Sequence, residues 1–155
     1  MNLDKFTDRA RGFLQAAQTI AQREDHQKLG PEHILKALMD DEQGMAAALI
    51  KRAGGEPARV REAVDLTLSR IPKVTGEGAS LISDRQLVKV LDEAEKLSKK
   101  AGDSFVAVER MLTALAIVTS PAREALEAAA VNAQSLNAAI NDLRKGRTAD
   151  SAGAE

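Results

Sequence analysis

The chain has 155 residues, and at this length one domain, or two small ones, can bury a hydrophobic core. The absence of cysteine excludes disulfides, thiolate catalysis and cysteine-ligated zinc, and the apolar fraction of 44%, rich in alanine, favours helices over sheets. The formal net charge is −1 with the two signs interspersed, so no nucleic acid or membrane partner is expected, because both select a face of one sign.

The sequence also predicts the compartment. No apolar run reaches the roughly 18 residues of a membrane span. The first five residues, Met-Asn-Leu-Asp-Lys, do not begin a signal peptide. We therefore expect a cytoplasmic protein.

Apolar residues recur at steps of three and four along the first half of the chain, which is the pattern of amphipathic helices. Proline at a first helical position and glycine after a last one indicate where these helices begin and end. The four predicted helices run from about residue 3 to Arg23, from Pro31 to the acidic run 40–42, from Met45 to Arg52, and from Pro57 to about residue 69.

The segment 70–80 is rich in proline and glycine, and it predicts a connector with a hinge at 76–78. The second half then repeats the plan of the first and ends near Lys145. The final stretch, 146–155, is small and polar and predicts a flexible linker. The helices of the second half are predicted to begin after a cap at Ser83, at Val108, at Ser120-Pro121 and at Ser135.

The two halves are copies of one another. The spacing between corresponding residues slips by one loop residue, because Val60 corresponds to Leu136 at a distance of 76. We therefore predict an all-α fold of two pseudo-symmetric four-helix repeats, 3–69 and 81–145, that form one compact domain. Before the slip, six identical pairs stand 77 positions apart: Leu14 and Leu91, Ala17 and Ala94, Glu32 and Glu109, Leu35 and Leu112, Ala37 and Ala114, and Leu38 and Leu115.

Residues with catalytic or metal-binding chemistry are sparse. His26, Glu32 and His33 are close in sequence, but adjacent helical residues point about 100° apart and no HExxH spacing is present, so no metal site is predicted. The segment 76–78 lacks the third glycine, the lysine and the preceding strand of a phosphate-binding loop. With neither a Gly-x-Ser-x-Gly elbow nor a Ser-His-Asp arrangement, we expect a binding domain and not an enzyme.

Four polar residues are candidates for binding or for local structure. Glu32 and Glu109 lie near the start of the second helix of each repeat, where a carboxylate complements the helix dipole. The same carboxylates can present a fixed acceptor to arginine, lysine or backbone N–H groups of a partner. Thr7 and Asp103 allow the same two interpretations, because each can also satisfy a helix end or a turn locally.

The chain resembles the amino-terminal Clp repeat domain of the Clp AAA+ ATPases, most closely that of the disaggregase branch. The resemblance covers about Leu3 to Lys145 together with the tail. It rests on Gly30-Pro31-Glu32-His33-Ile34-Leu35-Lys36-Ala37-Leu38, on the connector 70–76, and on Gly102-Asp103-Ser104-Phe105-Val106-Ala107-Val108-Glu109 with Leu112 and Ala114-Leu115.

The resemblance implies a non-catalytic domain that captures unfolded or aggregated client proteins for a homohexameric, ATP-driven disaggregase working with a DnaK-type chaperone system. It assigns client contacts to Thr7, Asp103 and Glu109 and to an apolar surface that includes Leu97, in a groove between the repeats. Glu32 is a possible secondary acidic site. No cofactor is expected in this chain, whereas ATP and Mg are expected for ATPase modules further along the parent protein.

Two residues depart from the family pattern. Ala107 stands where a hydroxyl cap is common and Arg110 where an apolar residue or histidine is usual, which predicts a weaker apolar patch. A related branch of the family uses the equivalents of Glu32 and Glu109 to recognise phosphorylated arginine or to dock adaptors. Adaptor docking and a free-standing helical scaffold are therefore kept as alternatives. Since Asp103 precedes only the second glutamate, we expect the two repeats to be functionally unequal.

Overall fold

The computed structural model describes residues 3–42, 44–75 and 81–154, and within them nearly all of the regular secondary structure is helical. A 3-10 turn, η1 (Leu3–Lys5), comes first, and two short strands, β1 (Lys28–Leu29) and β2 (Ile82–Ser83), lie between helices. No helix in these ranges is long and apolar enough to cross a membrane. The α-helices are α1 (Asp8–Arg23), α2 (Pro31–Asp40), α3 (Met45–Arg52), α4 (Pro57–Ser69), α5 (Arg85–Lys100), α6 (Val108–Ile117), α7 (Pro121–Ala128) and α8 (Ala133–Arg144).

Equivalent helices of the two halves begin at the spacings that the sequence predicts. Helices α1 and α5 both have 16 residues, and α2 and α6 both have 10. The starts of α5 and α6 lie 77 positions after those of α1 and α2, whereas α7 and α8 start 76 positions after α3 and α4. The predicted architecture of two four-helix repeats is confirmed.

Two short parallel backbone pairings join the repeats to each other. Strand β1 pairs in parallel with β2 through Leu29 and Ser83, and Phe6 forms a parallel bridge with Val106. Leu29 and Val106 stand 77 apart, as do Phe6 and Ser83, so the same contact is made twice with the repeats exchanged. The sequence did not predict these pairings, because two-residue strands have no measurable periodicity.

The predicted starts of two helices in the second half were wrong. Helix α5 is capped by Asp84, whose Oδ1 accepts the Gln86 N–H at 2.8 Å, because Ser83 is engaged in the strand pairing. Helix α8 begins two residues earlier than predicted, with Asn132 as its cap and Ser135 as the residue that bonds back to it. The predicted hinge at 76–78 lies outside the described residues.

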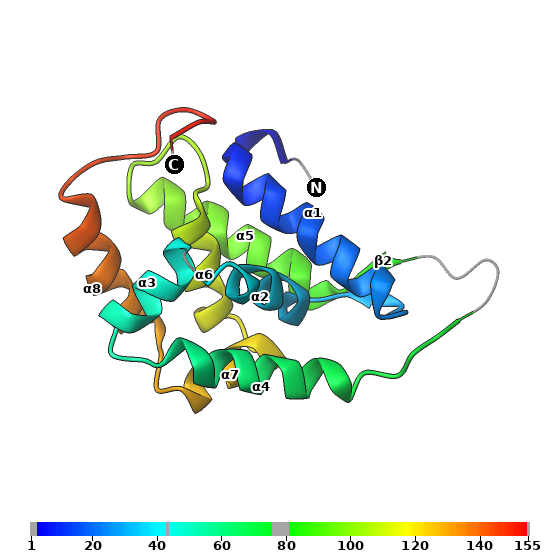
Figure 1. Cartoon of the computed structure of the whole chain (residues 1–155). Helices are drawn as coiled ribbons and strands as arrows, with labels where there is room; N and C mark the ends of the chain where they lie inside the picture. The colour runs from blue at the N-terminus through cyan, green and yellow to red at the C-terminus, as the bar shows by residue number, and fades with distance from the viewer. Residues whose placement is uncertain (1–2, 43, 76–80, 155) are drawn as a thin grey trace.

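The core lies between the helices of the two repeats. Helix α6 is buried from Val108 to Ala116, and α2 is buried at eight of its ten positions, so these helices form the centre of the domain. In Figure 1 they lie between α1 and α5 on one side and α4 and α7 on the other, with α3 and α8 at one end. The side chains that are almost completely buried include Phe6, Ile34, Leu35, Leu38, Leu87, Met111, Leu112, Leu115 and Leu126.

The residues after α8 turn back onto the domain. Lys145 and Gly146 have positive φ angles of 49° and 86°, which end the helix and reverse the chain. Residues 147–154, which we call the tail, then run toward the start of α1 (Figure 1). Ala149 is buried there at 4% exposure. The sequence does not predict the contacts of the tail with the domain, because they are made largely by backbone groups.

The packing of the two repeats can be tested at a glycine. A Cβ at Gly55 would overlap the Val131 side chain and lie 3.2 Å from the Ala129 carbonyl oxygen, both in the other repeat. Gly55→Ala should therefore lower the free energy of unfolding by about 1–3 kcal/mol in denaturant titrations. Gly12→Ala is the control, because no atom lies within 4 Å of the added Cβ. Alanine is favoured over glycine inside a helix, so this substitution should raise the free energy of unfolding by about 0.5–1 kcal/mol. Equal effects of the two substitutions would contradict this packing.

Candidate functional site

Asp103 and Glu109 meet at Arg144, a residue that the sequence analysis did not single out. Arg144 Nη1 donates to Asp103 Oδ1 at 2.6 Å, and Arg144 Nε donates to Glu109 Oε1 at 2.5 Å. Arg110 Nε donates to the other oxygen of Asp103 at 3.2 Å. We call these four residues, Asp103, Glu109, Arg110 and Arg144, the Arg144 cluster.

The Arg144 cluster is mostly hidden from solvent. The side chain of Asp103 is 0% exposed and that of Arg144 is 14% exposed. Burial alone would raise the pKa of the Asp103 carboxyl, but hydrogen bonds from Arg144, the Ala149 N–H and Arg110 outweigh burial and hold this pKa below its ordinary value. The carboxylate of Asp103 is therefore kept charged by the cations around it.

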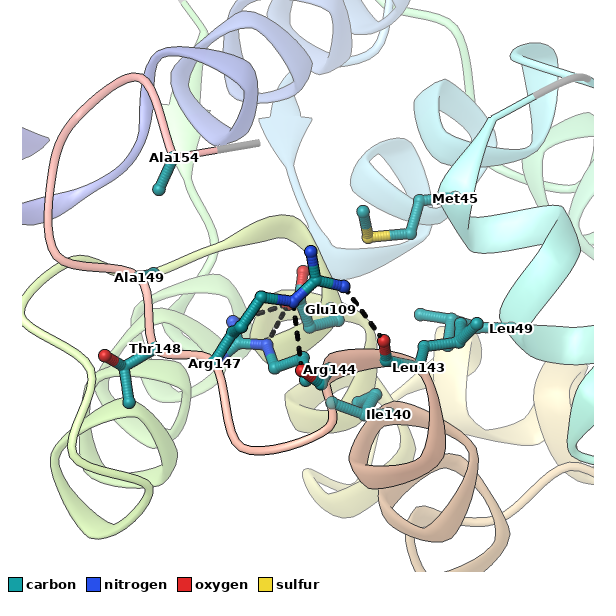
Figure 2. A pocket seen from close by; sticks show the side chains of 10 residues that line it. All are labelled: Met45, Leu49, Glu109, Ile140, Leu143, Arg144, Arg147, Thr148, Ala149 and Ala154. Atoms are coloured by element: carbon teal, nitrogen blue, oxygen red, sulfur yellow. Dashed lines mark hydrogen bonds and ion pairs between the residues drawn. The ribbon is translucent and has the colours of Figure 1, made fainter.

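Glu109 and Arg144 line a pocket of 410 Å³ (Figure 2). Among the described residues, Glu109 Oε2 is the buried side-chain oxygen that has no hydrogen-bond partner. Such an acceptor favours a ligand that brings an N–H or O–H donor into the pocket. The rest of the lining is an apolar wall from α3 and α8 and a cover from the segment after α8: Met45, Leu49, Ile140 and Leu143, with Arg147, Thr148, Ala149 and Ala154.

Repeat one holds a neutral counterpart of this cluster. His26 and His33 stand 77 positions before Asp103 and Arg110, and His26 Nδ1 lies 2.8 Å from His33 Nε2. The Gly30 N–H donates to His33 Nδ1 at 3.0 Å, so this network assigns the proton of His33 to Nε2, which donates to His26. The same position therefore carries a charged pair in one repeat and a neutral pair in the other.

Burial shifts the two ionisable groups at the start of α2 in opposite directions. It raises the pKa of Glu32 to about 7, with a further contribution from Asp84. Burial, together with His26, lowers the pKa of His33 to about 4. At neutral pH this end of repeat one therefore carries far less charge than the Arg144 cluster.

The cap residues direct the two equivalent glutamates differently. A Cβ at Gly30 would overlap the carboxylate of Glu32, which folds back over the cap. The equivalent residue Ala107 has a Cβ and is completely buried, so Glu109 cannot take that position and extends to Arg144 instead. The difference between Gly30 and Ala107 thus gives the two glutamates different conformations.

The structure places Thr7 at the N-cap of α1. Its hydroxyl accepts the Ala10 N–H at 3.1 Å, its backbone N–H donates to the Val106 carbonyl, and it is 0% exposed. The helix-cap hydrogen bond of its hydroxyl therefore accounts for a threonine at this position. Thr7 does not line the Arg144 pocket.

Leu97 lies apart from both the Arg144 pocket and the groove between the repeats. It is half-buried and lines a separate pocket of 390 Å³ with Arg110 and Thr113. Arg110, predicted to weaken an apolar surface, instead turns its charge inward to Asp103, with 6% of its side chain exposed. The depression between the repeats has a volume of 290 Å³ and is lined by leucines 3, 14, 29, 87 and 91 with polar Arg11, Gln15, Gln18 and Ser83.

A metal centre is not supported. Within residues 3–42, 44–75 and 81–154, no group of three His, Cys, Asp or Glu side chains is arranged to hold a metal ion. The two histidines are instead bonded to each other.

Comparison with known proteins identifies the family. Residues 5–129 match the profile of the family described as Clp repeat (R) N-terminal domain. The chain belongs to this family. Two proteins named chaperone protein ClpB are similar over the whole chain, with 58% identity in Agrobacterium fabrum and 53% in Mesorhizobium japonicum. The chain spans 18% of the length of each of these relatives. It is therefore a non-catalytic Clp N-terminal domain, as the sequence predicted.

Solved structures confirm the Clp N-domain fold. The Hsp104 N-terminal domain from Candida albicans aligns with a TM-score of 0.85 at 26% identity, over 97% of this chain and 99% of that one. The ClpV N-domain from Vibrio cholerae aligns with a TM-score of 0.73 at 20% identity, over 96% of this chain and 90% of that one. The predicted resemblance is thus confirmed along the length of the domain.

The structural role of Arg144 can be tested by removing its charge. Arg144→Gln removes the cation that the buried carboxylates of Glu109 and Asp103 share, and leaves only Arg110 beside Asp103, so the free energy of unfolding at pH 7 should fall by about 3–5 kcal/mol. Because the pKa of Asp103 is depressed in the fold, its contribution is present above the unfolded pKa and is lost as the pH falls through the folded value. The penalty should therefore shrink in acid. Arg147→Gln, an exposed control, should change stability little, and a penalty that does not depend on pH would contradict this role.

The opposite pKa shifts of Glu32 and His33 predict compensation. Stability from Glu32 is present below pH 4.5 and lost as the pH rises through about 7, whereas stability from His33 is present above pH 6.5 and lost as the pH falls through about 4. These effects offset each other between pH 4.5 and 6.5. In Glu32→Gln the histidine effect should remain alone, so stability should drop by about 3 kcal/mol between pH 6.5 and 4. Urea titrations at several pH values, with Glu127→Gln as control, measure this; parallel profiles for all three proteins would refute it.

Proposed function

We propose that the chain is the client-binding domain of a ClpB-type, ATP-dependent disaggregase in the cytoplasm, and that it captures unfolded or aggregated polypeptide. The observation that carries this proposal is the pocket at the Arg144 cluster, in which the unpartnered Glu109 Oε2 lies beside an apolar wall. Unfolded proteins expose apolar side chains, which can pack on the wall, and unpaired backbone N–H groups, which can donate to the acceptor.

Two further observations support client binding. The depression between the repeats offers a second apolar surface, built around the equivalent residues Leu14 and Leu91. A ClpV N-domain that aligns with a TM-score of 0.74 and 21% identity has been solved in complex with a VipB peptide. A domain of this shape is therefore able to hold a peptide, and the chain carries candidate surfaces for one.

Each contact should be weak. A handful of buried methylene groups contributes about 0.8 kcal/mol each, and the cost of ordering a disordered client offsets part of that gain, which gives micromolar to millimolar affinity per domain. Six tethered copies in a homohexamer would compensate through their effective concentration. ATP and Mg would act at the ATPase modules of that parent protein, with a DnaK-type system delivering clients.

Adaptor docking or phosphoarginine recognition at both glutamates is the alternative. It requires Glu32 and Glu109 to be presented alike. Glu32 instead folds over Gly30, and burial raises its pKa to about 7. Repeat one is therefore poorly arranged to bind a cation, which favours client capture by repeat two.

Client binding is tested by titrating isotope-labelled chain with reduced, carboxymethylated α-lactalbumin, a permanently unfolded protein. NMR shifts should cluster at the Arg144 pocket and in the depression between the repeats. Glu109→Ala should weaken binding about tenfold, as expected for loss of one hydrogen bond to a charged group, while the matched Glu32→Ala changes it less than about twofold. Denaturant titrations must show both variants folded. Equal losses would favour the two-site alternative, and a response to a folded partner alone would contradict client capture.

A further inference from the structure

The tail is bound by a row of backbone hydrogen bonds. The Ala149 N–H donates to Asp103 Oδ1 at 3.0 Å, and the Ala149 carbonyl accepts the N–H groups of Ser104 and Phe105 at 2.9 Å each. The Ala152 carbonyl accepts the Asp8 N–H, at the start of α1, at 2.8 Å. We call the four groups that hold the tail, on Asp8, Asp103, Ser104 and Phe105, the backbone notch.

The backbone notch uses almost no side chain of the tail. Ala149 is 4% exposed, so its methyl group is enclosed, whereas Ala152 is only half-buried. The remaining tail residues, Arg147, Thr148, Asp150, Ser151, Gly153 and Ala154, are exposed. The notch therefore recognises backbone groups around one small residue and makes little contact with the other side chains of the tail.

The tail lies over the residues to which client contacts are assigned. Asp103 is a direct partner of Ala149, and Asp8 directly follows Thr7. Thr148, Ala149 and Ala154 also form part of the lining of the pocket that contains Glu109. A client segment cannot use the same N–H groups and Asp103 while the tail occupies them.

We propose that the backbone notch binds a polypeptide segment through its backbone groups and one small residue, and that the tail is its resident occupant, displaced when a client binds. This inference rests on the proposed client-binding function. With a single enclosed methyl group, the tail buries little apolar surface and is readily released. Displacement also frees the chain that follows α8, so client binding lengthens the tether to whatever lies beyond the domain.

The test compares two leucine variants of the whole chain. Ala149→Leu cannot fit the enclosed methyl position, whereas Ser151→Leu adds the same side chain at an exposed position of the tail. In Ala149→Leu, amide exchange at Asp8, Ser104 and Phe105 should become about tenfold faster, and carboxymethylated α-lactalbumin should bind several-fold more tightly. Ser151→Leu should match the parent chain in both measurements.

A synthetic peptide with the tail sequence Arg-Thr-Ala-Asp-Ser-Ala-Gly-Ala completes the test. Added to Ala149→Leu, it should restore protection of the three amides and compete with α-lactalbumin. Unchanged exchange in Ala149→Leu, or peptide and client bound together without competition, would overturn the inference. If no form of the chain binds α-lactalbumin, the proposed function fails, and protection of the three amides by the peptide alone decides whether the notch recognises backbone.

Discussion

The guanidinium group of Arg144 connects the parts of the molecule that make up the candidate site. It lies at the end of α8 and bonds to carboxylates on the loop after α5 and on the first turn of α6. Two buried carboxylates this close would repel each other strongly without a cation between them. Because the tail begins only three residues after Arg144, the same interaction also fixes where the chain leaves α8 and lets Ala149 reach Asp103.

Duplication gives the domain two structurally equivalent positions with different chemistry. Where repeat two joins Asp103 to Arg110, repeat one joins His26 to His33 across the same seven-residue step. The fold therefore needs a bonded polar pair at this position, but it tolerates either a charged or a neutral one. The charged pair is accompanied by a pocket with a buried, unpartnered acceptor on Glu109, whereas the carboxylate of Glu32 in repeat one is folded over Gly30. The inequality that the sequence suggested thus has a physical basis in the side chains around each glutamate.

The sequence predicted the features that depend on local chemistry. The starts of α2, α4 and α7 follow from proline at the first helical position, and the spacings of 77 and 76 were confirmed by the helix bounds. It could not predict contacts between distant residues, since the bonds of Arg144 span 35 and 41 positions. The placement of Leu97 outside the depression between the repeats likewise depends on how α5, α6 and α8 pack. The sequence could not predict that the tail docks on the domain, because the contacts are hydrogen bonds made largely by backbone groups.

We propose that a client binds in the Arg144 pocket and in the depression between the repeats. The most direct measurement is paramagnetic relaxation of methyl groups in the presence of a spin-labelled unfolded client. We expect strong broadening at Leu49, Ile140 and Leu143 in the Arg144 pocket, and much weaker broadening at Leu66, which is 52% exposed on α4 and lines neither surface. Equal broadening at all four residues, or broadening confined to Leu66, would contradict client binding at these surfaces.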